Sequence, residues 1–108
     1  MDMADTVRHI IDGDKFIIEM MTNRFTYDLV EKLKTLHPFD EMCKFNTIEF
    51  NLEQVKMIDS SSIGFLFELH NKLRNEYSNV ALVISVGKNK ELKSLLHKFQ
   101  VDLLLNIQ

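Results

Sequence analysis

Four consecutive polar residues, Asp59, Ser60, Ser61 and Ser62, form the cluster in this sequence that is best equipped for chemistry. Two apolar residues precede them and an apolar run at helical spacing follows, which predicts a strand end, a tight turn and a helix start. Asp59 and Ser60 are suitable N-cap residues, because their side-chain oxygens can accept from free N–H groups of the first turn. A helix N-terminus also attracts anions, so a serine here could carry a phosphate that the helix end stabilises.

The segment Asp59-Ser60-Ser61-Ser62-Ile63-Gly64 resembles the Asp-Ser-Ser-Gly-Leu-Gly signature of STAS domains, specifically the bacterial anti-sigma factor antagonists. The second serine of that signature is the phosphoacceptor, so the resemblance assigns phosphorylation to Ser61. The order of the expected elements agrees with this family over residues 6–107. Ser62 departs from the pattern, because the family usually has glycine there. Ser60 and Ser62 are therefore competing phosphorylation sites, and the turn lacks a glycine's freedom at positive φ.

The resemblance implies a regulator that changes partners when it is phosphorylated. In this family the unphosphorylated antagonist binds an anti-sigma factor that is itself a GHKL-type serine kinase, phosphorylation breaks the complex, and a PP2C-type phosphatase reverses the modification. The resemblance implies signal transduction in a bacterial cytoplasm, such as transcription regulation, with no enzymatic activity and no cofactor. It also implies partner contacts around the signature and in an earlier polar connection, here Asp59, Ser60, Ser62, Ile63, Asn23, Arg24 and Thr26.

Two alternatives to a phosphorylation switch stay open at this point. One is a constitutive STAS interaction module that is never phosphorylated and works in a larger regulatory or transport-associated assembly. The other is a serine hydrolase, which would need a histidine beside one of the three serines in space. Lys88, Lys90 and Lys93 could hold a phosphate, although a solvated helix start is the simpler explanation.

Metal and nucleotide sites are not expected from the residue spacing. The chain has only three glycines, and none forms a phosphate-binding loop of the Walker or dinucleotide type. Cys43 has no cysteine or histidine at a zinc-ligand spacing, and no pair of histidines has such a spacing either.

Length and composition predict one globular domain over residues 1–108, with 45% hydrophobic and 27% charged residues. The net charge of −3 favours neither nucleic acid nor an anionic membrane as a partner. The N-terminal residues are acidic and lack the features of a secretory signal. A single cysteine cannot form an internal disulfide, so a reducing cytoplasm is the expected location.

The elements expected to position the serine cluster are strands that alternate with helices. Asp12-Gly13-Asp14 lies between two apolar runs and predicts a β-hairpin of strands 6–11 and 15–21. The second strand is almost continuously apolar, so we expect it to be buried on both faces. Further strands are expected at 46–52 and 79–86, and helices at 27–36 (capped by Thr26), 61–77 and 90–99, while residues 101–107 fit either a strand or a docked helical turn. The expected fold is a single α/β, STAS-like domain with a mixed four- to five-stranded sheet and helices packed against it.

Overall fold

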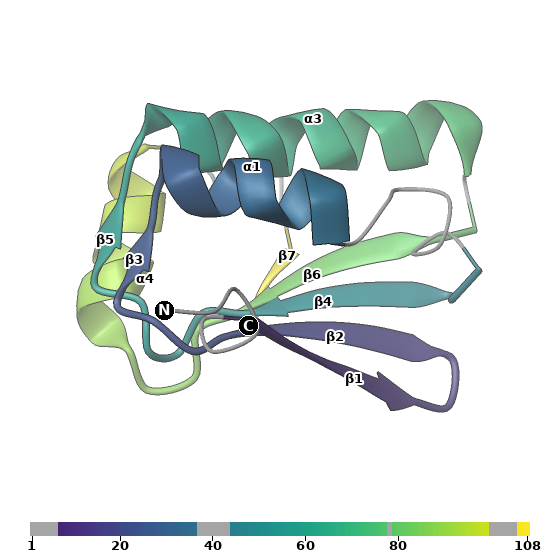
Figure 1. Cartoon of the computed structure of the whole chain (residues 1–108), viewed down its shortest axis with the longest axis horizontal. Coiled ribbons are helices and arrows are strands. Elements are labelled where there is room, and N and C mark those ends of the chain that lie inside the picture. Colours follow the sequence, from purple (N-terminus) through teal and green to yellow (C-terminus); the bar gives the residue numbers. More distant parts are fainter. Residues whose placement is uncertain (1–6, 37–43, 78, 100–105) are drawn as a thin grey trace.

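A computed structural model describes residues 7–36, 44–77, 79–99 and 106–108, which form a mixed sheet with helices packed against it (Figure 1). The sheet order is β1 (Val7–Asp12), β2 (Lys15–Met20), β4 (Thr47–Asn51), β6 (Ala81–Ser85) and β7 (Asn106–Ile107). β1 and β2 are antiparallel, and the other neighbours are parallel. This five-stranded α/β arrangement confirms the predicted fold class.

The β1–β2 hairpin confirms the turn predicted from its sequence. Asp12 pairs with Lys15, so the loop has only two residues, Gly13 and Asp14. Gly13 has a φ of +59°, a conformation that two-residue hairpin loops require and that glycine adopts readily.

Three helices pack against the sheet: α1 (Tyr27–Leu36), α3 (Ser60–Glu76) and α4 (Lys90–Lys98). Figure 1 shows α1 and α3 side by side over the same face of the sheet. Phe65 of α3 contacts Phe50 of β4 edge to face, with ring centroids 6.0 Å apart. The core between the layers consists of alternate strand residues and one stripe of each helix, including Phe16, Ile18, Met20, Ile48, Phe50, Ile84, Leu29, Leu33, Leu66, Leu69, Leu73, Leu92 and Leu96.

The prediction that the second strand is buried on both faces is wrong. In β2 the residues Phe16, Ile18 and Met20 are buried, whereas Ile17 and Glu19 between them are partly exposed. Figure 1 shows α1 and α3 over one face of the sheet. The other face carries cross-strand ion pairs, such as Lys15 Nζ to Glu49 Oε1 at 3.5 Å, so the apolar run has only one buried side.

A second, two-stranded sheet replaces the polar connection expected before the first helix. β3 (Arg24–Phe25) pairs in parallel with β5 (Met57–Ile58), and Figure 1 shows them running together to the starts of α1 and α3. The carbonyl of Asn23 accepts from Lys56 N at 2.7 Å and from Met57 N at 3.0 Å. These bonds hold two segments that are far apart in sequence at the same end of the domain.

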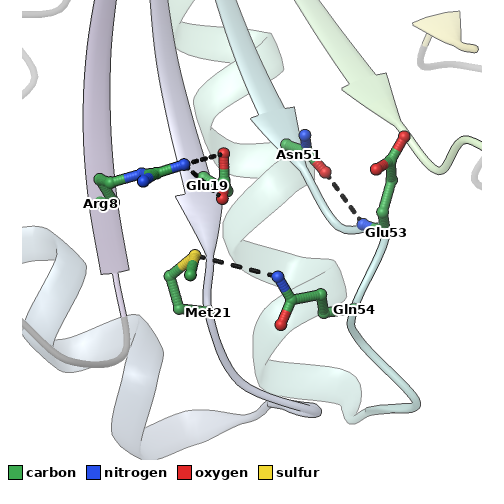
Figure 2. A network of polar contacts seen from close by, with 6 residues as sticks. All are labelled: Arg8, Glu19, Met21, Asn51, Glu53 and Gln54. Carbon is green, nitrogen blue, oxygen red and sulfur yellow. Dashed lines mark hydrogen bonds and ion pairs between the residues drawn. The ribbon is translucent and has the colours of Figure 1, made fainter.

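The loop between β4 and β5 is fixed by side-chain contacts (Figure 2). Asn51 Oδ1 accepts from the backbone N of Glu53 at 3.1 Å. Gln54 Nε2 lies 3.9 Å from the sulfur of Met21, which follows β2. These two contacts hold the loop to the end of β4 and to the segment that follows β2.

The C-terminal end of the chain forms β7, beside β6. Gln108 N donates to the carbonyl of Ile84 at 2.7 Å, and Val86 N donates to the carbonyl of Gln108 at 2.8 Å. For the tail, the strand alternative therefore holds at Asn106–Ile107, while residues 101–105 of that prediction lie outside the described residues.

Candidate functional site

Asp59 is the N-cap of α3, with an extended backbone at φ −132° and ψ −179°. Its Oδ1 accepts from the backbone N of Ser62 at 2.9 Å, as an N-cap carboxylate should. Its Oδ2 accepts from the backbone N of Tyr27, the first residue of α1, at 3.0 Å. One carboxylate therefore satisfies free N–H groups at the starts of two helices and ties those starts together.

Ser62 closes a capping box with Asp59. Its Oγ accepts from Asp59 N at 3.1 Å and donates to the carbonyl of Asp59 at 2.9 Å. The side chain is also fully buried. This hydroxyl is therefore both hydrogen-bonded and inaccessible to solvent. The serine that departs from the family's usual glycine therefore has a structural role in this chain.

Ser60 and Ser61 are the accessible hydroxyl residues of the cluster. Of the two suitable N-cap residues, Asp59 takes that position, and Ser60 is already the first residue of α3. Ser60 is exposed and Ser61 is partly exposed. Both line a groove of about 310 Å³ between α1 and α3, together with Tyr27, Val30, Glu31, Lys34, Gly64, Phe65 and Glu68.

Asp59 is ionised at neutral pH. Burial raises the pKa of its carboxyl, but hydrogen bonds from Ser62 N, Tyr27 N and Ser61 N together outweigh that effect. The pKa therefore lies below the ordinary value of 3.8. A fixed negative charge consequently lies next to Ser60 and Ser61.

The residues predicted in the earlier connection lie beside this cluster through the β3–β5 pairing. Asn23 and Arg24 are exposed, and Arg24 is the strand partner of Met57. Thr26 occupies the residue before α1, where its carbonyl accepts from Leu29 N at 3.0 Å and from Val30 N at 3.1 Å. Ile63, which was also predicted to contact a partner, lies in the hydrophobic core.

Two residues at this end of the domain were not identified from the sequence. Tyr27 is 56% exposed and reaches the cluster from a different helix, so no local pattern indicates it. Asn89 donates from Nδ2 to the carbonyls of Glu53 at 3.0 Å and Val55 at 2.6 Å, and its Oδ1 caps α4 through Leu92 N at 3.1 Å. An asparagine at an expected helix start was the only available signal for this second residue.

The structure gives no support to other site chemistries within the part that it describes. No histidine lines the groove beside Ser60 and Ser61, as a serine hydrolase would require. No cluster of three His, Cys, Asp or Glu side chains suited to a metal occurs among the described residues, and His37 and Cys43 lie outside them. Within the same ranges, every helix is too short or too polar to span a membrane.

The chain belongs to the STAS domain family, because the family model for the STAS domain matches residues 5–108. No match was found among curated proteins.

Solved structures with the same fold include a Thermotoga maritima protein described as an anti-sigma factor antagonist. It has a TM-score of 0.73 and 20% identity, over 97% of this chain and 87% of that chain. The unphosphorylated anti-sigma factor antagonist SpoIIAA has a TM-score of 0.69 and 13% identity, over 94% of this chain and 86% of its own. The phosphorylated form of SpoIIAA, a Bacillus cell fate determinant, has a TM-score of 0.65 and 11% identity, over 94% and 90%. At these identities the likeness shows a shared fold.

Proposed function

We propose that this protein is a phosphorylation-controlled partner-switching regulator of the anti-sigma factor antagonist type. It binds a GHKL-type serine kinase, acting as an anti-sigma factor, while Ser61 is unphosphorylated, and it releases that partner after phosphorylation. A PP2C-type phosphatase restores the binding form. The protein acts in the cytoplasm as a binding module in signal transduction, such as transcription regulation, and not as an enzyme.

The observation that carries this proposal is that the three serines at the start of α3 differ in burial and in hydrogen bonding. Ser62 is buried and its hydroxyl is bonded to Asp59. Ser61 is partly exposed in the first turn of α3 and borders a groove. Ser61 also occupies the phosphoacceptor position of the family signature, so register and accessibility favour the same residue. Ser60 is accessible as well and is the remaining competitor.

A phosphate on Ser61 would act on the interface and leave the fold intact. It adds about −1.5 to −2 charges. The N–H groups and dipole of a helix start stabilise such a charge by some tenths of a kcal/mol. The ionised Asp59 beside it makes the local surface strongly negative. A partner surface shaped for a neutral hydroxyl would then meet two adjacent negative groups.

The proposed partner surface extends from Ser61 over the paired ends of β3 and β5. It includes Asp59, Ser60 and the exposed residues Asn23 and Arg24. Tyr27 and Met57 are exposed by 56% and 49% in the same region, and both offer apolar contact area. Alanine substitutions of Asn23 and Arg24 should weaken binding while the melting temperature stays within a few degrees.

The proposal is tested by incubating the chain with a GHKL-type serine kinase and ATP and measuring the intact mass. We expect the addition of one phosphate. Ser61→Ala should abolish it, whereas the matched control Ser60→Ala should retain it. A Ser61→Ala variant that still accepts phosphate would refute the assignment of the site. No modification by any cognate kinase would instead favour a constitutive STAS interaction module.

A further inference from the structure

The outer edge of the sheet at β1 has the features of a self-association site. β1 is an edge strand of six residues, each of which pairs with β2. Within the described part of the chain, no strand pairs with its other side, and Figure 1 shows β1 at the margin of the sheet. β1 contains no proline, a residue by which natural edge strands discourage pairing with another chain, and its two charged residues, Arg8 and Asp12, have opposite signs.

The hairpin geometry determines which backbone groups of β1 point outward. Asp12 and Lys15 close a two-residue loop and therefore form a hydrogen-bonded pair. Such pairs alternate along an antiparallel ladder, so the backbone groups of Arg8, Ile10 and Asp12 point toward β2. The backbone groups of intervening residues, such as Ile11, point away from the sheet.

Side-chain charge selects one register for pairing with another β1 strand. Arg8, Ile10 and Asp12 lie on the sheet face opposite the helical layer, in the order positive, apolar, negative. In an antiparallel pair with a two-fold axis at Ile10, this residue meets its own copy, and Arg8 of each chain faces Asp12 of the other. Moving the axis by one residue in either direction places a charge opposite Ile10, and moving it to Arg8 places two positive charges together.

The existing contacts of these residues are compatible with this register. Arg8 Nη2 bonds the two carboxylate oxygens of Glu19 at 3.0 and 3.1 Å, while the arginine side chain stays 58% exposed (Figure 2). A guanidinium has five N–H donors, so donors remain for a second carboxylate. Ile11, which is 59% exposed in this chain, would be partly covered by the added strand.

From this geometry we propose that two copies of the chain associate along β1, with the two-fold axis at Ile10, to form one continuous sheet. Five paired residues bury less surface than a standard stable interface, so the dimer is weak and depends on concentration. β1 lies away from the start of α3 in Figure 1, so both copies keep Ser61 accessible. The proposal is independent of the phosphorylation switch.

Sedimentation of the full chain over a wide concentration range tests the proposal. We expect the mean mass to rise from 12.7 kDa toward twice that value as concentration increases. Asp12→Arg places two positive charges opposite each other at both ends of the paired segment, and Ile11→Pro removes an outward N–H. Both variants should remain monomeric. The matched control Asp14→Arg lies in the turn, outside the paired residues, and should associate like the wild type.

A mixing experiment checks the register itself. Arg8→Asp and Asp12→Arg should each be monomeric alone, but an equal mixture should form a heterodimer because residues 8 and 12 then have opposite charges at both ends of the pairing between the two chains. Circular dichroism confirms that each variant is folded. The proposal is overturned if the wild type stays monomeric at its highest soluble concentration, or if its dimer survives both Asp12→Arg and Ile11→Pro. A mixture that stays monomeric when the wild type dimerises would overturn the register.

Discussion

At the scale of single residues, the carboxylate of Asp59 contributes to both the structure and the electrostatics of the candidate site. Its two oxygens accept from Tyr27 N and Ser62 N, so the relative position of the two helix starts depends on one side chain. The same hydrogen bonds keep it ionised beside Ser61, where its charge would add to that of the proposed phosphate. The residue that positions the proposed phosphorylation site is therefore also part of the electrostatic surface around it.

Substitution of Asp59 should show this double capping as a graded loss of stability. Asp59→Ala removes acceptors from two helix starts and should cost about 2 kcal/mol in the free energy of unfolding. Asp59→Asn keeps one carbonyl oxygen and should lose roughly half as much. Urea unfolding measures both, with Asp28→Asn in the exposed first turn of α1 as the control. Equal stability of Asp59→Asn and wild type would mean that the second cap contributes nothing.

The pH dependence of this effect follows from the direction of the pKa shift. The carboxyl has a lower pKa in the folded state than its ordinary value of 3.8, so its stabilising contribution is present above that pH. The contribution is lost as the pH falls through the folded-state pKa. The stability difference between wild type and Asp59→Asn should therefore be constant near neutral pH and narrow below about pH 4. A difference that grows on acidification would contradict the assignment.

Ser62 provides a second prediction at this scale, because its hydroxyl is structural. Ser62→Ala leaves the backbone N–H of Asp59 without its acceptor and should lower the free energy of unfolding by about 1–2 kcal/mol. The variant should still accept one phosphate. Ser60→Ala, which alters an exposed residue, should leave stability almost unchanged. Loss of phosphorylation in a folded Ser62→Ala variant would instead identify Ser62 as the acceptor.

At the scale of elements, the sequence was informative wherever a periodic pattern was long enough to define one face. The Asp12-Gly13 turn, the alternation around Ile48 and Phe50, and the three helices were all predicted and are present. β3 and β5 were missed because a two-residue strand has no period to detect. The double burial of β2 was wrong because an apolar run does not reveal whether helices cover one face or two.

The candidate site could be predicted only in part for a related reason. Local sequence located the cluster at a helix start, but it did not decide which residue is the N-cap. The choice between Asp59 and Ser60 as the N-cap depends on the extended backbone of Asp59 and on the burial of Ser62. The contact with Tyr27 joins residues 32 positions apart, and no local pattern reports such a contact.

Alanine substitutions of two glycines should change the stability of the protein in opposite directions. Gly64 lies on the exposed side of α3, and an added Cβ there would meet no atom within 4 Å. Gly64→Ala should therefore stabilise the protein by up to about 1 kcal/mol through helix propensity. Gly87 has a φ of +54°, and an added Cβ would overlap the side chain of Glu53, so Gly87→Ala should destabilise. Thermal melts of the two variants should move in opposite directions, and a fall for Gly64→Ala would mean that its position is misassigned.

At the scale of the whole molecule, the sheet separates two surfaces that can act independently. The starts of α1 and α3 meet at one end, where β3 and β5 fix them side by side. The edge strand β1 lies at the opposite margin of the sheet from β7. The proposed partner exchange at the first surface and the proposed self-association at the second therefore need not compete.

The most direct test of the switch is the dissociation constant of the complex with the GHKL-type kinase. It is measured by titration with the unphosphorylated chain and with the chain that carries one phosphate on Ser61. We predict that binding is at least about tenfold weaker after phosphorylation, which is a loss of about 1.4 kcal/mol or more. Equal or tighter binding of the phosphorylated form would contradict it.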